Sequence, residues 1–462
     1  MFLLSLLAFL PKLIFGFSLA HLIWNDTRVS SIFLKGFLGI PLGMGVGSIL
    51  IFFWKLAGLS HSGYVVFEIS FVAITLAVTL ILQKGFIKGI DFDISIKPLL
   101  ENKMLLSGLI LVIGISITNF MFTVLLHPHG NEDTWSNWNL LARFIYYSAN
   151  LSDTFAYLSS STFPGYPFMI SLDVANGWIF LNSVTTRVPI LVAGLFTFSI
   201  PGILFFSLVR IRGIQLASIA TILVMGPWLA QFGSLLYADI PVAVYYLSTG
   251  ALVSLYLQTD SLGLVRLAGF MAGFSAWTKN DGLPFVMITT LTILIISIQK
   301  KQKNVAISFF QGLATPMAAV GVYKIFFAAP GNIVANGNAM LDRLQDFSRF
   351  QVVLEFFASN IASFGYPPVG FIWILLALLL VGGINVGDRN SGYIAFILVL
   401  QGAVYFAVYL ITPLDLKWHL ASSGGRVIMH LIPLFIFVAF NYLRPSNPLA
   451  FQGELDNHAP NH

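Results

Sequence analysis

Long apolar stretches separated by short polar links run along most of this chain. Many windows exceed the length of about 18 uncharged residues that is typical of a membrane-spanning helix. The segments 104–126, 240–259 and 390–414, for example, contain no Asp, Glu, Lys or Arg. This pattern predicts an all-α, polytopic integral membrane protein.

A window rule on hydropathy predicts about 13 transmembrane helices. We expect them near residues 3–23, 35–56, 64–83, 104–126, 188–209, 214–231, 239–258, 262–278, 282–299, 305–327, 368–387, 391–413 and 427–443. The first lacks a basic segment before its apolar run, so we interpret it as a retained membrane helix and not a signal peptide. Segment 166–182 is apolar but contains Asp173 and Asn176, which is compatible with a re-entrant or interfacial helix.

Composition supports the membrane assignment and excludes other classes. Apolar residues make up 57% of the 462 positions and charged residues 9%, and the mean hydropathy is +0.86. A soluble domain carries roughly 25% charged residues. The chain has no cysteine, which excludes disulfides and thiolate metal sites. A net charge of +5 without a basic aromatic patch gives no indication of nucleic-acid binding.

The positions of lysine and arginine predict the orientation, because these residues concentrate in cytoplasmic links. They cluster between the expected helices at Lys84, Lys88, Lys97, Lys103, Arg210, Arg212, Lys300, Lys301, Lys303, Arg389 and Arg444. If these links are cytoplasmic, the alternation of spans works from residue 84 onward, provided that 166–182 does not cross. Five polar elements then converge on the outer face, namely 127–165, 237–239, 279–281, 329–366 and 415–426.

The first of these elements begins with an acidic pair. Glu132 and Asp133 follow the fourth expected span, and Trp135 can anchor the next stretch at the membrane interface. A carboxylate shielded there can serve as a general base on a hydroxyl. An acidic loop with a tryptophan belt explains the same residues equally well. His127 and His129 are candidate metal ligands, although two loop histidines are more often solvated.

The later elements place charges beside helix ends. Asp239 is followed two residues later by a proline, which is also a common helix-capping pattern. Lys279 and Asp281 share one short turn, and a lysine on the outer face is better tolerated beside an anion. Arg426 enters a span, where its planar guanidinium suits a phosphate or carboxylate but can also simply reach the interface from a helix end.

Five short motifs in order along the chain resemble the membrane-embedded GT-C glycosyltransferases. Among these, the chain is most similar to bacterial relatives of protein mannosyltransferases and aminoarabinose transferases. The motifs are DTWSNWN at 133–139, YP at 166–167, YADIP at 237–241, WTKNDG at 277–282 and WHLASSGGR at 418–426. The resemblance covers about 115–445. It implies a GT-C-like catalytic domain at 104–445, after N-terminal helices at 1–103 without a counterpart and before a polar tail at 446–462.

The resemblance implies a sugar on polyprenyl phosphate as donor and an inverting single displacement. Asp133 takes the role of base for the acceptor hydroxyl, with Glu132 as the alternate. Lys279 and Arg426 become contacts of the donor phosphate, and Asp239 a second acidic site residue. The substrate-binding set is completed by Asp281, His419, Trp135 and Tyr237. The acceptor hydroxyl can belong to a lipid, a glycan or a protein, and the expected location is the bacterial inner membrane, with the site on its outer face.

Two positions depart from the family pattern. Gly425 stands where relatives often carry an Asp before the terminal Arg, so the carboxylate that orients Arg426 is missing from the motif, and Asp281 stands where Glu is common. We expect no metal and no other cofactor, because the run 131–133 lacks the acid-x-acid spacing of metal-using relatives.

Two other classes compete with the transferase. A transporter or flippase of a lipid-linked saccharide predicts charges deep inside several spans, whereas the expected spans are largely uncharged. A non-catalytic scaffold that keeps the fold is the second rival, and Gly425 is the feature that favours it.

Overall fold

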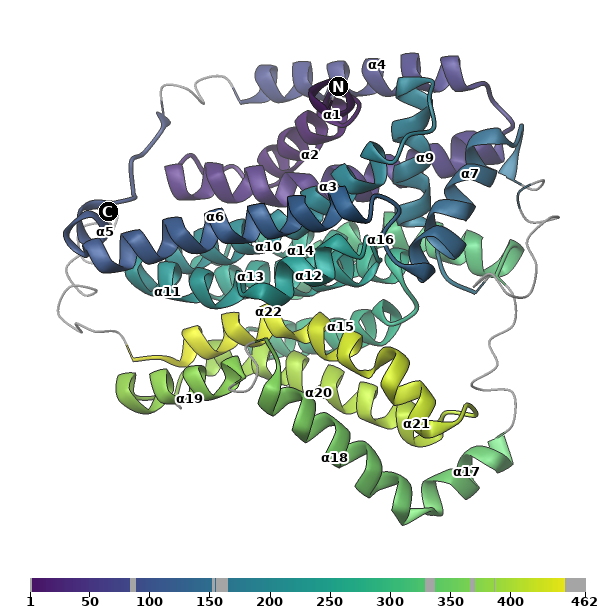
Figure 1. The fold of residues 1–462 in the computed structure, drawn as a ribbon. Helices are drawn as coiled ribbons and strands as arrows, with labels where there is room; N and C mark the ends of the chain where they lie inside the picture. The colour runs from purple at the N-terminus through teal and green to yellow at the C-terminus, as the bar shows by residue number, and fades with distance from the viewer. Residues whose placement is uncertain are drawn as a thin grey trace.

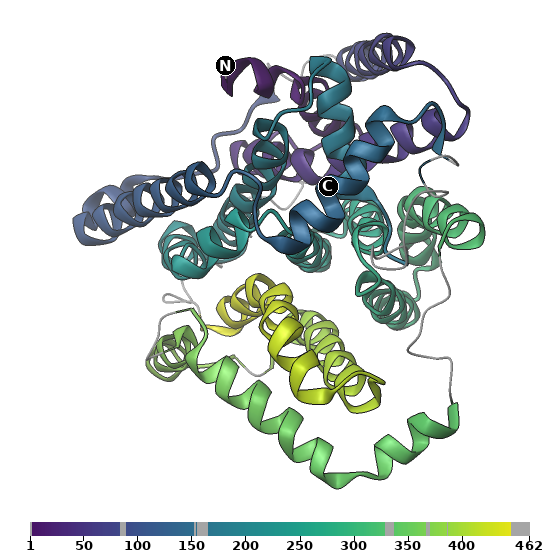
Figure 2. The same cartoon turned by 45° about the vertical axis from the view of Figure 1, so that its right-hand side comes forward.

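The computed structural model describes residues 2–83, 89–151, 154, 165–328, 337–365, 370–385 and 387–444, and within these ranges the chain is helical without any strand. Most of the long helices lie side by side along one direction (Figures 1 and 2). The all-α prediction is therefore confirmed. The expected polar tail at 446–462 and parts of both long loops lie outside the described residues.

The N-terminal half contains helices α1 (Phe2–Leu7), α2 (Leu10–Ile23), α3 (Val29–Leu56), α4 (His61–Leu82), α5 (Lys97–Glu101), α6 (Lys103–Leu126), α7 (Asn139–Tyr147), α9 (Met169–Leu181), α10 (Arg187–Arg212), α11 (Ile214–Val224) and α12 (Pro227–Ser234). The C-terminal half contains α13 (Asp239–Thr259), α14 (Leu262–Thr278), α15 (Gly282–Gln299), α16 (Lys303–Phe326), α17 (Gly337–Gln345), α18 (Phe347–Ser363), α19 (Phe371–Gly382), α20 (Arg389–Ile411), α21 (Leu416–His419) and α22 (Gly425–Tyr442). Two π-helical turns, Thr134–Trp138 and Leu420–Gly424, precede α7 and α22.

Ten helical segments within the described ranges are long and apolar enough to cross a membrane, or eleven if α11 and α12, bent by 54°, form one span. The chain is thus a multi-pass membrane protein by length and composition, while the count of 13 is not confirmed. The expected number of spans is too high because some helices are shorter than the apolar runs that predicted them. Helix α19 has 12 residues, about 18 Å at 1.5 Å per residue against a hydrocarbon core of about 30 Å.

Helix α9 is the apolar segment that sequence alone could not assign to a span. It has 13 residues, about 20 Å in length and too short to cross a core of about 30 Å. It runs across the direction of the neighbouring long helices in both views (Figures 1 and 2). If α9 does not cross the membrane, the links that carry the lysine and arginine clusters all lie on one side of it.

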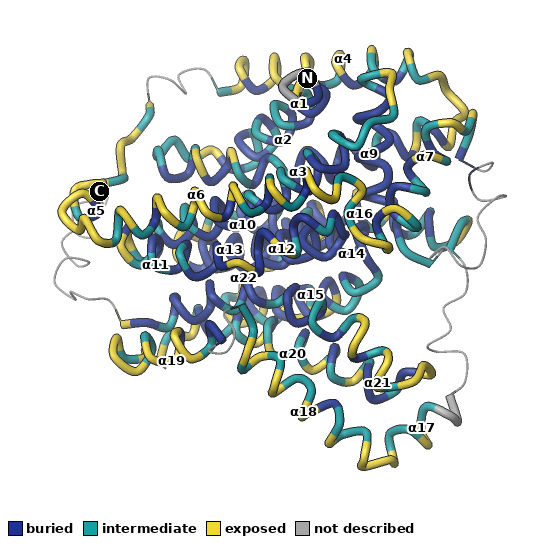
Figure 3. The backbone as a smooth tube through the Cα atoms, viewed as in Figure 1, coloured by how far each residue is buried: buried dark blue, intermediate teal, exposed yellow. Residues whose placement is uncertain are grey.

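Helix α13 forms the centre of the bundle. Every residue of its best apolar window is buried, whereas only about a fifth of the corresponding window of α6 is buried, at 22%. Figure 3 shows the exposed positions gathered on peripheral helices such as α4, α6 and α19. A helix that is apolar on all sides is expected in the interior, and the N-terminus of α13 carries Asp239 into that interior.

Small residues let α2 and α3 approach closely. A Cβ on Gly43 would lie 2.0 Å from the Lys12 carbonyl oxygen, and one on Gly16 would lie 1.9 Å from the Gly39 carbonyl oxygen. Backbone contact of this kind is typical of helix packing in membranes. The contact fixes the part of α2 that carries Lys12.

We expect Gly43→Ala to lower the thermal unfolding midpoint of the detergent-solubilised protein, since the added methyl forces α2 and α3 apart. Overpacking of this kind costs about 1–3 kcal/mol. Gly36→Ala is the matched control on the same helix, because nothing lies within 4 Å of a Cβ at Gly36. The control should be neutral or slightly stabilising, and equal midpoints for the two variants would contradict the packing argument.

The charges separate toward the two ends of the bundle. One end, called the basic end, carries Arg210, Arg212, Lys300 and Arg389 at the ends of α10, α15 and α20. Ion pairs there join Lys300 to Asp260 and Arg212 to Asp388. The opposite end, called the site end, contains the residues that sequence analysis selected.

Candidate functional site

Five charged side chains at the site end form one row of alternating sign. Arg426 lies between Asp133 and Asp239, and Lys279 lies between Asp239 and Asp281. The nitrogen–oxygen distances along this row are 2.6, 2.8, 2.8 and 3.1 Å. Because the five residues come from four distant segments, the row joins the site end together, and we call it the charge row.

Two π-helical turns position the outer members of the charge row. Asp133 directly precedes the turn Thr134–Trp138, and Arg426 is the second residue after the turn Leu420–Gly424. Such turns are rare and occur frequently at functional sites. Before the first turn, Gly130 adopts φ +71 and packs against the Leu235 carbonyl, where a Cβ would lie 2.7 Å from the oxygen. This close turn brings Asp133 toward α13.

Asp239 is the centre of the charge row and is almost fully buried, with its side chain 1% exposed. Its Oδ1 accepts from Lys279 Nζ and lies 2.7 Å from His430 Nε2, and its Oδ2 accepts from Arg426 Nε and Nη2. The side chain makes no hydrogen bond that caps α13. The capping interpretation of Asp239 is therefore wrong, and the residue instead holds two cations and a histidine.

A chain of hydrogen bonds continues from Asp239 into the bundle. His430 Nδ1 lies 2.8 Å from the Tyr405 hydroxyl, which lies 3.1 Å from the Tyr246 hydroxyl. Tyr246 donates to the Asp281 carbonyl oxygen at 2.8 Å. All of these side chains except Asp281 are buried. The network therefore returns to the charge row and fixes the His430 ring against Asp239.

Lys279 is buried between two carboxylates. Burial lowers the pKa of Lys279, but the charges of Asp239 and Asp281 outweigh this effect and raise the pKa above its ordinary value. The ammonium therefore stays charged throughout the physiological pH range. The ring of Tyr166 lies 5.8 Å from Lys279 Nζ, so the aromatic residue of the YP motif also belongs to this environment.

Arg426 is oriented by carboxylates that lie far away in sequence. It donates to Asp133 and Asp239, and its guanidinium lies 4.4 Å from the centre of the Tyr237 ring. Burial and the nearby Asp133 charge raise the pKa of Tyr237, so its hydroxyl stays protonated. The residue at position 425 thus does not deprive Arg426 of an orienting carboxylate, and the side chain does not reach outward from the helix end.

The structure joins six of the sequence-selected residues and leaves three outside. Asp133, Asp239, Lys279, Asp281, Arg426 and Tyr237 share the charge row or contact it. Glu132 is exposed and makes no ion pair with any described residue, and Trp135 is 55% exposed. His419 bonds to Thr412 Oγ1 at 2.9 Å and lies against Tyr409, outside the charge row.

Two further residues, His430 and Lys324, lie at the site end although the sequence did not predict them there. His430 lies four residues after Arg426 on α22, and this spacing alone puts both on one helix face. Lys324 donates to the backbone carbonyl oxygen of Gly165 at 2.7 Å and to the side-chain amide oxygen of Asn280 at 2.6 Å. Within the described residues it has no carboxylate partner, in contrast to Lys279 beside it in the same turn network. Its charge is therefore available to an anion.

A second group of ionisable residues lies inside the N-terminal helices. Lys12 on α2 pairs with Asp173 on α9 at 2.7 Å, with exposures of 2% and 0%. Asn176 on α9 donates to Glu68 on α4 at 3.2 Å and to Tyr64 at 3.1 Å. Ionisable residues therefore lie inside helices whose spans are otherwise largely uncharged. We call Lys12, Asp173, Asn176, Glu68 and Tyr64 the Lys12 cluster.

Comparisons with known proteins place no family on this chain: no family model, curated protein or solved structure matches it. Among the described residues, no three His, Cys, Asp or Glu side chains are grouped so that they could hold a metal ion. The functional argument therefore depends on the geometry of the charge row.

Proposed function

We propose that this protein is a glycosyltransferase that moves a sugar from a polyprenyl-phosphate donor to an acceptor hydroxyl. The observation that carries the proposal is the state of Asp133. Its side chain is 32% exposed, and Arg426 holds only its Oδ2. Within the described residues, Oδ1 has no hydrogen-bond donor, so one oxygen of an oriented and partly exposed carboxylate is free to accept a proton.

In the proposed reaction, Asp133 Oδ1 accepts the proton of the acceptor hydroxyl. The acceptor oxygen bonds to the anomeric carbon as the bond from that carbon to the phosphate oxygen breaks, and the phosphate leaves with the electron pair. The configuration inverts in this single displacement. A base placed in this way typically contributes about 10²–10⁴-fold to the rate.

The leaving phosphate needs a cation that is not already neutralised. The charge row contains three carboxylates and two cations, which leaves it one negative charge in excess with His430 neutral. Lys279 and Arg426 therefore serve mainly to orient the carboxylates. Lys324, which bonds only to uncharged amide oxygens in the described chain, is the neighbouring cation best suited to the departing anion.

The orientation of the protein is part of the same proposal. The cations of the basic end fit the rule for cytoplasmic links, which supports a site end on the non-cytoplasmic side of the membrane. Described residues Arg210, Arg212, Lys300 and Arg389 carry this argument, whereas Lys84 and Lys88 lie outside the described residues. A bacterial inner membrane fits a donor built on polyprenyl phosphate.

The first test compares Asp133→Asn with wild type on a panel of radiolabelled polyprenyl-phosphate sugars. We expect release of sugar by wild type and a loss of about 10²–10⁴-fold in the variant. Glu132→Gln is the matched control, since it removes the adjacent carboxylate, which has no ion pair among the described residues, and it should change the rate only a few fold.

Thermal unfolding of Asp133→Asn should remain near wild type, because a partly exposed ion pair contributes about 0–1 kcal/mol. Equal turnover by Asp133→Asn and wild type would remove Asp133 as base. Turnover that collapses in Glu132→Gln instead would move the base by one residue.

A transporter or flippase of a lipid-linked saccharide is the second candidate, and the Lys12 cluster is the observation that favours it. Ionised residues inside membrane helices are typical of transport pathways. A wild-type protein that releases no sugar from any donor, but moves a labelled donor across proteoliposomes, would establish this class. Failure of both assays would favour the non-catalytic scaffold.

A further inference from the structure

A pocket of about 560 Å³ opens at the site end of α6, next to the π-helical turn that follows Asp133. The loop after α6 contributes His127 and His129, and α7 contributes Asn139 and Arg143. Trp135 closes one side. None of the described residues that line this pocket is acidic, so no carboxylate among them would repel an anion.

Two side chains of α7 point to an anionic ligand. Asn139 and Arg143 are four residues apart, so they share one helix face, and both line the pocket. Asn139 is 8% exposed, yet its amide makes no side-chain hydrogen bond within the described chain. Arg143 is exposed and has no carboxylate partner in the described ranges. A buried amide and an unpaired guanidinium together suit phosphate oxygens.

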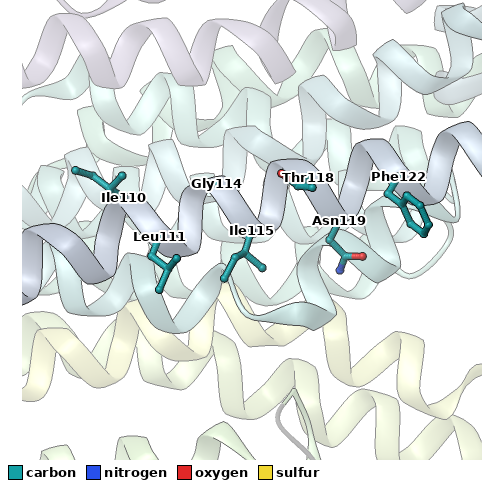
Figure 4. A pocket seen from close by; sticks show the side chains of 7 residues that line it. All are labelled: Ile110, Leu111, Gly114, Ile115, Thr118, Asn119 and Phe122. Atoms are coloured by element: carbon teal, nitrogen blue, oxygen red, sulfur yellow. The ribbon is translucent and has the colours of Figure 1, made fainter.

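A separate apolar recess lies along α6, on the part of the helix that precedes this pocket. It has a volume of about 580 Å³ and extends from Ile110 to Phe122 (Figure 4). Gly114 forms its floor, since nothing lies within 4 Å of a Cβ there. Phe122 lines the recess and Leu126 lines the pocket. Their spacing of four residues puts both on one face of α6.

Two polar side chains, Thr118 and Asn119, interrupt the recess at membrane depth. Asn119 lines it, and its amide has no hydrogen-bond partner among the described residues. A polar group that faces hydrocarbon without a partner is costly. An amide in this position is better explained if the ligand brings ester or hydroxyl oxygens below its headgroup than if only hydrocarbon covers the helix.

We propose that α6 and α7 form a binding site for a membrane lipid with a phosphate headgroup. The phosphate lies among Asn139, Arg143 and the two histidines, the polar linkage reaches Asn119, and a hydrocarbon chain occupies the recess over Gly114. From Ile110 to Leu126, α6 rises about 24 Å, close to the roughly 20–22 Å of one leaflet with its headgroup region. The inference goes beyond glycosyl transfer and is tested without turnover.

The test measures binding of radiolabelled dioleoyl phosphatidic acid to the full-length protein in detergent micelles. Arg143→Gln should weaken binding at least tenfold. Lys417→Gln is the matched control, because it removes an exposed cation of the same end outside the pocket, and it should change binding less than twofold. Equal affinities for Arg143→Gln and wild type would overturn the headgroup assignment.

A second pair of variants tests the hydrocarbon part. Gly114→Leu fills the recess without a backbone clash and should weaken binding at least fivefold, whereas Gly321→Leu on α16, with equally open space, should not. Unfolding midpoints near wild type for both variants exclude misfolding as the cause. Phosphatidylcholine or diacylglycerol bound as tightly as phosphatidic acid would refute selection of an anionic phosphate headgroup. Inorganic phosphate that competes at micromolar concentration would refute the lipid in favour of a free anion.

Discussion

An Asp239→Asn variant is expected to lose both folded stability and activity. The carboxylate oxygens of Asp239 lie 2.7 to 3.1 Å from side-chain nitrogens of Lys279, Arg426 and His430. The Asp239 side chain is 1% exposed. The substitution removes the charge that compensates two cations. It also turns an amide NH₂ toward one of these donors, whichever way the amide is oriented. Loss of one partner from a buried ion pair costs about 3–5 kcal/mol.

The measurement is the thermal unfolding midpoint in detergent, followed by sugar release from the donor that wild type uses. Asp281→Asn is the matched control. It removes a carboxylate from the same lysine, but Lys279 keeps Asp239, and the Asp281 side chain is 26% exposed. Its stability loss should therefore stay near the value of about 0–1 kcal/mol for exposed pairs. Wild-type stability of Asp239→Asn would mean that the charge row does not hold the site end together.

The contrast between Asp239 and Asp133 separates two roles. Asp239 has both oxygens occupied, whereas Asp133 has one oxygen held by Arg426 and one without a donor in the described chain. We therefore expect Asp133→Asn to lose activity at nearly unchanged stability, and Asp239→Asn to lose both. A scaffold without catalytic function predicts the stability loss of Asp239→Asn but no sugar release from wild type.

The convergence of Asp133, Asp239, Lys279 and Arg426 could be predicted from the sequence because it depends on span alternation. Short links force successive helices to run in opposite directions, so polar residues at alternate links reach the same end. Hydropathy measures the length of an apolar run, and that length is what most of the long helices require. The number of spans is harder to predict from the sequence, because a hydropathy window cannot detect the bend before Pro227 or the early end of α19 at Gly382.

The place of His430 in the site could have been predicted from the sequence. A histidine inside a span is a functional candidate by default, and its spacing of four residues from Arg426 predicts a common helix face. The Lys12–Asp173 pair could not be predicted from the sequence, since the two residues are 161 positions apart. The pair forms only because α9 runs across the direction of the neighbouring helices, and no local sequence pattern indicates this direction.

The Lys12 cluster leads to the second large expected effect. Lys12→Met should lower the unfolding midpoint strongly, because it leaves the Asp173 carboxylate buried at 0% exposure without its cation. Asp173 Oδ2 and Glu68 Oε2 already have no hydrogen-bond partner in the described structure. The expected cost is about 3–5 kcal/mol. Lys417→Met, which removes an exposed lysine, is the control and should stay within about 0.5 kcal/mol of wild type.

The double variant Lys12→Met with Asp173→Leu decides what the cluster is for. Replacing both members of a buried pair by apolar residues is often neutral or stabilising, so a purely structural pair predicts that the double variant recovers most of the stability lost by the single one. If stability recovers and sugar release also stays at the wild-type level, the cluster serves only packing between α2 and α9. If stability recovers but movement of a lipid-linked saccharide is lost, the ionised residues belong to a transport pathway, and the transferase proposal gives way to the second candidate. A double variant less stable than the single one would show that the pair positions α9 through its charges.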